Sequence, residues 1–119
     1  MMKFIRFPLV FRFPLVFCTV MILPMPASAM DANSGFILNV NVQQEGAAIF
    51  YVSNLAGAWP TCAATFARFA ISTSTPAGQA MFATILSAVK THTTVTIHGK
   101  GNCDIWGDSE SVEYISITS

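Results

Sequence analysis

The first 29 residues constrain this chain more than any other stretch, because they decide which part folds and in which compartment. Lys3 and Arg6 give a positively charged start, an apolar run follows, and Ala27-Ser28-Ala29 precedes the first acidic residue. A basic start, an apolar middle and a small-x-small end are typical of a secretory signal peptide. We therefore expect residues 1–29 to be cleaved off, residues 30–119 to form a single domain, and the product to be periplasmic or secreted.

The apolar run contains an internal repeat. Residues 6–11 (RFPLVF) recur at 12–17, which places a charge and two prolines within the run. The uninterrupted apolar stretch from Phe13 to Met25 has about 13 residues, whereas a membrane-spanning helix needs about 20. An uncleaved anchor and a start codon misassigned within the repeat are the alternatives. We expect no stable membrane anchor, and neither alternative changes the domain that follows.

Few charges remain after Ala29. Three basic residues (Arg68, Lys90, Lys100) stand against six acidic ones (Asp31, Glu45, Asp104, Asp108, Glu110, Glu113), a formal net charge of −3 (3 − 6). Nucleic-acid binding requires a basic face that displaces counterions, and three scattered cations do not form one. We therefore exclude nucleic acid as a partner, together with a polybasic contact with a membrane surface.

Two cysteines remain after the signal peptide, since Cys18 lies within it. A domain of about 90 residues is close to the lower limit for a self-sufficient core, and small exported domains are often cross-linked. In an oxidising compartment we expect a disulfide between Cys62 and Cys103. A metal site and a reactive thiol are weaker alternatives, because neither cysteine belongs to a CxxC motif.

Hydrophobic periodicity predicts five strands and one helix in the mature chain. The predicted strands are Phe36–Gln43, Ala47–Ser53, Arg68–Ser72, Thr94–Gly99 and Val112–Thr118. Thr75 followed by Pro76 is a typical helix start, and apolar positions at helical spacing continue to about Thr91. The stretch Asn54–Thr61 contains Gly57 and Pro60 and is expected to be a loop.

The same patterns predict which side chains face the core. In the first strand, alternation places Phe36, Leu38, Val40 and Val42 on one face of a half-buried strand. On the helix, the apolar stripe consists of Met81, Phe82, Ile85, Leu86, Ala88 and Val89. Gly78 is expected to allow close approach of the helix to the sheet. In the fourth strand, Val95 and Ile97 are expected to point inward and His98 outward.

The element order β-β-β-α-β-β is that of an OB-fold, a five-stranded Greek-key barrel with a helix between its third and fourth strands. We therefore predict a mainly β domain with one helix and this barrel architecture. A ferredoxin-like sandwich would need a second helix, and no loop is long enough to hold one. A helix packed on an open meander is the remaining alternative.

No residue pattern nominates catalysis, a metal site or a cofactor. His92 and His98 lack a positioned nucleophile or a paired-histidine spacing. Asn102 and Asp104 resemble the start of a calcium loop, but Trp106 occupies a ligand position, so a solvated turn is the preferred interpretation. The late acidic residues include paired carboxylates, as in glycosidases, but the domain is too small for a substrate cleft.

The most informative side chains are Trp59 and Trp106, which lie in loops at Trp59-x-x-Cys62 and Cys103-x-x-Trp106. Both indoles are expected to shield the disulfide and extend the core, or to form a platform for a sugar or a partner. Polar side chains on an uncharged strand face would add hydrogen-bonding groups. The candidate ligand-binding residues are Ser34, Asn39, Tyr51, Trp59 and Trp106, with Asn41 and Gln43 on the same strand face.

Two pieces of the chain resemble the binding subunits of bacterial AB-type toxins, in particular the subtilase cytotoxin B-subunit group. Residues 33–38 (NSGFIL) are similar to that group's Ser-Gly-hydrophobic entry to its first strand, and 85–97 to its helix leading into a strand. The matched pieces cover about a quarter of the chain. The resemblance implies Ser34 as a glycan contact, a homo-oligomer, a partner toxin subunit and no catalysis in this chain.

Two functions are therefore expected. The first is a secreted, non-enzymatic module that binds host glycans. The alternative is a periplasmic or secreted protein-binding module, such as an inhibitor or an envelope accessory factor, with the Trp59 and Trp106 loops as its contact region.

Overall fold

The computed structural model of the chain describes residues 28–117. The predicted signal peptide lies outside this range except for Ser28 and Ala29. The described part is mainly β with one helix, as the sequence predicts. Among the described residues, no helix combines the length and the apolar content needed to cross a bilayer.

Residues 28–117 form seven strands, two more than the sequence predicts. The strands are β1 (Met30–Gly35), β2 (Ile37–Gln43), β3 (Ala47–Val52), β4 (Leu55–Gly57), β5 (Phe69–Ser72), β6 (Val95–Gly99) and β7 (Glu110–Ile117). The helix α1 spans Pro76–Thr91, and a short 3-10 helix, η1, spans Thr61–Ala63. The predicted strands correspond to β2, β3, β5, β6 and β7, so the additional ones are β1 and β4.

The two additional strands arise from bends in a long hairpin. Only Phe36 separates β1 from β2, and only Ser53 and Asn54 separate β3 from β4. The backbone of Ser53 donates to the carbonyl of Phe36 at 2.9 Å, and Phe36 donates to the Ser53 hydroxyl at 2.8 Å. The prediction of a loop at Asn54–Thr61 was wrong for β4, because Leu55–Gly57 pairs with β1 despite its turn-forming composition.

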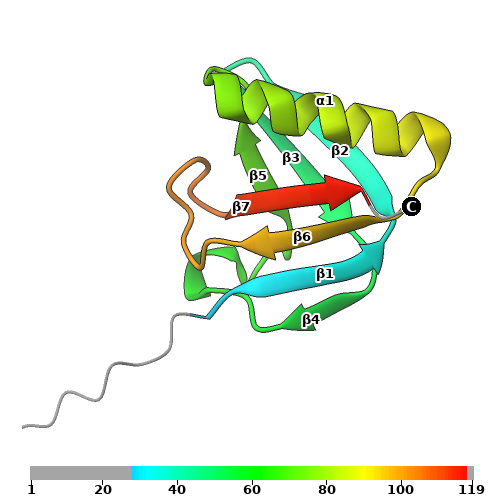
Figure 1. Cartoon of the computed structure of the whole chain (residues 1–119). Coiled ribbons are helices and arrows are strands. Elements are labelled where there is room, and N and C mark those ends of the chain that lie inside the picture. Colours follow the sequence, from blue (N-terminus) through cyan, green and yellow to red (C-terminus); the bar gives the residue numbers. More distant parts are fainter. Residues whose placement is uncertain (1–27, 118–119) are drawn as a thin grey trace, which may run out of the picture.

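The strands form one sheet in the order β2-β3-β5-β7-β6-β1-β4. β5 and β7 are parallel, and every other pairing is antiparallel. In Figure 1, β2, β3 and β5 lie behind β7, β6 and β1, and α1 crosses the top of both layers. The sheet is therefore strongly curved. The strand at one end of the order, β2, continues along the chain from β1, and the strand at the other end, β4, continues from β3.

The core fills the space between these layers and the helix. Phe50 and Phe69 are fully buried at its centre, with ring centroids 5.9 Å apart. The other buried members of this cluster are Met30, Ala32, Ala48, Val52, Ile71, Ile85, Ala88, Val95, Ile97 and Val112. The prediction that Val95 and Ile97 point inward is confirmed. His98, which follows Ile97 in β6, is half-exposed.

The helix begins where the sequence predicts, because its first turn is capped. The Thr75 hydroxyl accepts a hydrogen bond from the Gly78 backbone N–H at 3.1 Å. A Cβ on Gly78 would lie 1.7 Å from the Ser72 carbonyl oxygen, so the close approach expected of this glycine is confirmed. His92 ends the helix in a left-handed conformation, with φ of 53°.

The predicted burial of the first strand was partly wrong. The pairing of β2 with β3 shifts between Ile37 and Asn39, so Leu38 is an extra residue in a bulge. A bulge reverses the alternation on one side of it. As a result Ile37 and Val40 pack against the core, whereas Leu38 is 66% exposed. Phe36 and Val42, which alternation also assigned to the core, are 38% and 59% exposed. Phe36 lies between β1 and β2, and Val42 lies near the end of β2, next to the turn to β3.

Candidate functional site

Three side chains from three neighbouring strands form a row on the outer face of β1, β6 and β7. Asp31 pairs in register with His98, and His98 pairs in register with Tyr114. The rings of His98 and Tyr114 are stacked, with centroids 5.4 Å apart and an interplanar angle of 21°. Asp31 Oδ1 and His98 Nδ1 are in hydrogen-bond contact. We call these three residues the outer-face row.

The outer-face row is accessible to a ligand. Tyr114 is 51% exposed, and the side chains of His98 and Asp31 are 43% and 40% exposed. Thr96 and Ser116 are also paired, one step along the same face. Side chains two residues apart on a strand share a face. The row is therefore an aromatic surface bordered by a carboxylate and hydroxyl groups.

Ser34 lies at the end of β1, one of the strands that carries the outer-face row. It is exposed and has a φ of 51°. The pairing of β1 with β6 shifts between Ala32 and Gly35, so Ser34 sits within this irregularity. The resemblance implies a role for Ser34, whereas no sequence motif marks Asp31 or Tyr114. Alternation in the strands was the available signal, because it places His98 and Tyr114 on outward positions.

Asn39 and Tyr51 form a second group, on β2 and β3. They are directly opposite each other in register. The pKa of Arg68 is raised, chiefly by its hydrogen bond with Asp108 and to a smaller extent by the neighbouring Tyr51. The structure therefore brings Asn39 and Tyr51 together, but in the layer of strands behind the one that carries Ser34 (Figure 1).

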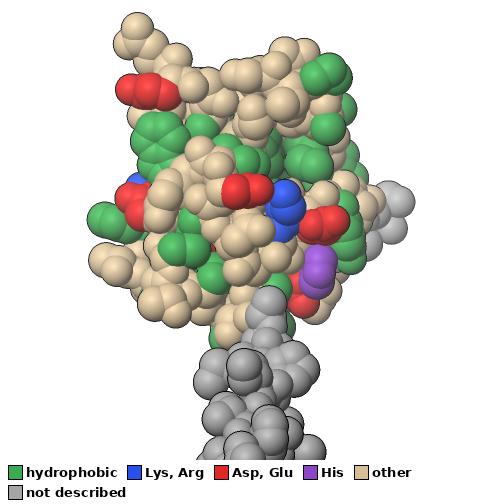
Figure 2. Space-filling view, turned by 90° about the vertical axis from the view of Figure 1, so that its left-hand side faces the viewer, with side chains coloured by type: hydrophobic (Ala, Val, Ile, Leu, Met, Phe, Trp, Pro, Cys, Tyr) green, Lys and Arg blue, Asp and Glu red, His purple; other side chains and the backbone are tan. Residues whose placement is uncertain are grey.

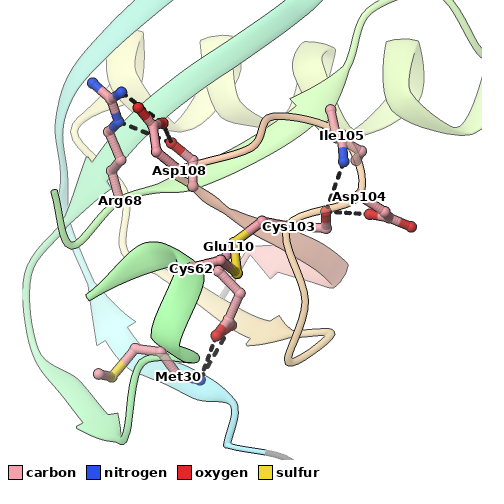
Figure 3. Close-up of a disulfide and its surroundings, with 10 residues drawn as sticks. Met30, Cys62, Arg68, Cys103, Asp104, Ile105, Asp108 and Glu110 are labelled. Carbon is pink, nitrogen blue, oxygen red and sulfur yellow. Dashed lines mark hydrogen bonds and ion pairs between the residues drawn. A yellow bond between two sulfur atoms is a disulfide. The ribbon is translucent and has the colours of Figure 1, made fainter. Parts of the chain in front are cut away.

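The disulfide predicted between Cys62 and Cys103 is present. The two sulfur atoms are bonded, and the Cα atoms lie 6.2 Å apart. The bond joins η1 to the loop between β6 and β7, as Figure 3 shows. This loop and η1 lie on the left in Figure 1, and Figure 2 shows that end of the molecule with charged side chains scattered among hydrophobic and uncharged ones.

The two tryptophans are both half-buried. Trp59 packs against the core cluster, and its ring centroid lies 5.0 Å from that of Phe69. Trp106 is half-buried and makes an isolated β-bridge with Ser109. Trp59 therefore extends the core, as the first of the two interpretations of the tryptophans predicts.

Polar side chains hold the loop between β6 and β7 to Arg68, which precedes β5, and to the start of β7. Arg68 donates to the carboxylate of Asp108 at 2.8 Å and to the Ser109 hydroxyl at 2.8 Å. The Asp104 carboxylate accepts from the Ser111 hydroxyl and from Lys100 Nζ, the latter at 3.1 Å. These hydrogen bonds hold the pKa values of Asp108 and Asp104 below their usual range.

No metal centre emerges from residues 28–117, where no three His, Cys, Asp or Glu side chains are arranged to hold an ion. The carboxylate of Asp104, which the calcium-loop interpretation would need, is engaged by Ser111 and Lys100. Asp104 therefore hydrogen-bonds to side chains on either side of it in the chain.

One carboxylate is fully buried. Glu110, the first residue of β7, has 0% exposure, and both of its carboxylate oxygens accept from the backbone nitrogen of Met30, each at 3.1 Å. Burial raises the pKa of Glu110 to about 7, and the Met30 hydrogen bond opposes this rise. The close-up in Figure 3 shows the contact in the surroundings of the disulfide.

Comparison with known proteins identifies no relative: no family model, no curated protein and no solved structure matches this chain. The site is therefore interpreted from its own geometry.

Proposed function

We propose that the mature domain is an exported, non-enzymatic module that binds carbohydrate, as the resemblance to toxin binding subunits implies. The outer-face row is the observation that carries this proposal. Exposed aromatic rings offer apolar faces to the C–H faces of sugars, and Asp31 is an acceptor for sugar hydroxyls. Thr96 and Ser116 add neutral hydrogen-bonding groups beside the rings.

The position of Ser34 also supports carbohydrate binding. The resemblance implies that this serine contacts glycans, and Ser34 is an exposed residue of a strand that carries the outer-face row. A glycan lying along β1 would contact both Ser34 and the outer-face row. Asn39, Tyr51, Trp59 and Trp106 are outside this surface, so in the proposed site they do not contact the sugar.

The architecture that we propose is an OB-type barrel that closes through β1 and leaves the outer edge of β2 open. If β1 with β2 and β3 with β4 each count as one bent strand, the domain has the five strands predicted from the sequence. The first would then pair with the second through β2–β3 and β1–β4 and with the fourth through β1–β6. The parallel β5–β7 pairing supplies the contact between the third and the fifth. The helix lies between the third and fourth, as the OB arrangement requires.

The test is a glycan array followed by calorimetry on the best ligand. We expect Tyr114→Ala and His98→Ala to weaken binding by about tenfold or more, since each removes one ring of the stacked pair. Tyr51→Ala, which removes an aromatic ring from the other layer of strands, is the matched control and should leave affinity unchanged. Absence of any glycan ligand, or a loss that follows Tyr51 instead of Tyr114, would refute the proposed site.

Self-association is the second part of the proposal, and it involves an apolar patch on β2 and α1. Leu38, Leu86 and Val89 surround an open hollow of ≈ 300 Å³, together with Ile37, Asn39 and Val40. Leu86 and Val89 are 47% and 45% exposed. We define Leu38, Leu86 and Val89 as the apolar patch. Two of the six residues of the predicted helix stripe therefore face outward, which its periodicity alone did not reveal.

A second copy of this chain is the proposed occupant of the apolar patch. β2 is the first strand of the sheet order, with β3 its partner in that order. Unpaired strand edges beside apolar side chains are templates for another chain. The three patch side chains carry no charge, so two copies can meet there without burying one. A protein-binding module, the alternative function, would instead leave the chain monomeric until a foreign protein occupied the patch.

A further inference from the structure

The backbone nitrogen of Met30 occupies an unusual position for a residue inside a continuous chain. Its single N–H is shared between both oxygens of one buried carboxylate, with both N···O distances 3.1 Å. A carboxylate of full negative charge, placed over one nitrogen, matches a protonated amine better than a neutral amide, because an ammonium group offers three protons and a charge. Glu110 is the only acidic side chain with 0% exposure among the described residues.

The sequence places the expected cleavage point at this same nitrogen. Ala27-Ser28-Ala29 is the small-x-small motif, and cleavage after Ala29 makes Met30 the first residue of the mature chain. Met30 is also the first residue of β1 and belongs to the buried core, whereas Ser28 is exposed. The first strand of the described residues therefore begins at the residue that the leader motif marks.

We propose that Glu110 is the receptor for the mature amino terminus: removal of residues 1–29 turns the Met30 amide into an α-ammonium group, which forms a buried ion pair with the Glu110 carboxylate. A leader peptidase would catalyse the step with one water molecule. The Ala29–Met30 C–N bond breaks, the water oxygen joins the Ala29 carbonyl carbon to give a carboxylate, and the nitrogen takes up protons to become the ammonium.

The surroundings of Glu110 suit such a pair. Gly99 lies against its carboxylate, since a Cβ there would be 1.4 Å from Oε2, so the chain keeps space for the acidic group. The ionisable neighbours are Asp31, whose charge disfavours the ionised form of Glu110, and His98, whose positive charge would favour it. The new ammonium would be the closest positive charge and would hold Glu110 ionised.

The consequence is that the chain gains stability when its leader is removed. Before cleavage, Glu110 is a buried carboxyl group with one shared amide donor. After cleavage it is paired with an opposite charge, and a buried charge is stable only when it is paired and hydrogen-bonded. The pair would also tie the start of β1 to the start of β7, which are 80 residues apart in sequence.

The test compares two exported chains that share the same leader. One is the natural sequence, and the other carries a Ser-Gly insertion between Ala29 and Met30, which moves the terminal ammonium two residues away and leaves an amide at Met30. Intact mass and N-terminal sequencing of the natural product should give Met30 as its first residue. At pH 7.5 the insertion should raise the unfolding equilibrium constant by at least about tenfold, the equivalent of one pKa unit at Glu110.

Substitution of Glu110 distinguishes loss of the ion pair between Glu110 and the Met30 ammonium group from other effects of the insertion. Glu110→Gln should destabilise the natural mature chain strongly and the inserted chain little, whereas Glu113→Gln, an exposed control on the same strand, should affect neither. The proposal is overturned if the mature chain begins elsewhere, if the insertion is neutral, or if Glu110→Gln costs both chains equally. If Glu110→Gln prevents folding, the comparison of the two chains with intact Glu110 decides alone. Glycan binding plays no part in these measurements.

Discussion

Arg68 Nη2 lies 2.8 Å from Asp108 Oδ1, and this pair joins the residue before β5 to the loop before β7. The same guanidinium donates through Nε to the Ser109 hydroxyl. The backbone of Glu110 donates to the Arg68 carbonyl at 2.9 Å, which begins the parallel pairing of β5 with β7. Asp108 in the loop and Arg68 just before β5 thus align β5 and β7, two strands that no hairpin connects.

The Arg68–Asp108 contact predicts a modest loss of stability in acid. Its hydrogen bonds hold the pKa of Asp108 below the usual value of 3.8, so its contribution is present above that pH and is lost as the pH falls below it. The Asp108 side chain is 38% exposed, so we expect Asp108→Asn to cost less than about 1 kcal/mol at pH 7. Urea unfolding at pH 7 and pH 3 measures this, and a loss larger at pH 3 would contradict it.

The disulfide predicts a larger effect. It links residues separated by 41 positions, and in the chain-entropy model a loop of that length contributes about 4 kcal/mol. Cys62→Ser with Cys103→Ser should therefore lower the free energy of unfolding by about that amount, as measured by urea unfolding. The reduced natural protein is the control for the substitutions themselves. Equal stability of the oxidised and reduced forms would show that the bond does not stabilise the fold.

The helix cap gives a small and separable prediction. Thr75→Ala removes the acceptor for the Gly78 N–H and should cost about 1 kcal/mol. Thr75→Ser keeps a hydroxyl at this position and should cost much less. Thermal unfolding followed by circular dichroism compares the two. A loss of the same size in both variants would mean that the threonine methyl group, and not the hydroxyl, stabilises the helix start.

Glu110 predicts an inverted pH dependence in any chain that keeps an amide, and not a terminal ammonium group, at the Met30 nitrogen. Its pKa in the folded chain, about 7, is above the 4.5 of the unfolded chain, so the folded state binds more protons between these values. Stability should be greatest below pH 4.5 for this group and fall by about 3 kcal/mol as the pH rises through 7. Urea unfolding of the inserted chain from pH 4 to 8 measures it, and Glu110→Gln should flatten the profile. A stability that rises over this range and is unaffected by Glu110→Gln would contradict the prediction.

The apolar patch predicts the association state. Leu86→Asp places a charge in the patch and should convert the proposed homo-oligomer to monomers, because a buried unpaired charge opposes association. Ala83→Asp makes the same charge change at an exposed position on α1, outside the patch, and should leave the mass unchanged. Native mass spectrometry gives both masses. A natural protein that is monomeric at tens of micromolar would exclude self-association and leave the patch to a foreign protein.

Local pattern was sufficient for much of the fold. Alternation identified β2, β3, β5, β6 and β7, and the Thr75-Pro76 pair marked the start of α1. These features depend on residues that are close together in the sequence, so they can be predicted from the sequence alone. The strand β4 was not found, because three residues with a glycine form a strand only when a distant partner, β1, satisfies their backbone groups.

The candidate site was predictable only in part, for the same reason. Outward positions such as His98 follow from period two, but the row of Asp31, His98 and Tyr114 exists only because two register relationships align three strands. The bulge at Leu38 likewise depends on pairing with β3, and it exposes a side chain that simple alternation assigned to the core.

The sequence by itself determined the single helix, five of the strands, the pairing of the last two cysteines and the leader motif that ends at Ala29. Only the tertiary structure decided which side chains meet across strands, that Trp59 is part of the core, and that the Glu110 carboxylate lies over the nitrogen of Met30. The physical reason is that periodicity records whether a side chain faces water, whereas register and burial between distant segments depend on how the whole sheet closes around its core.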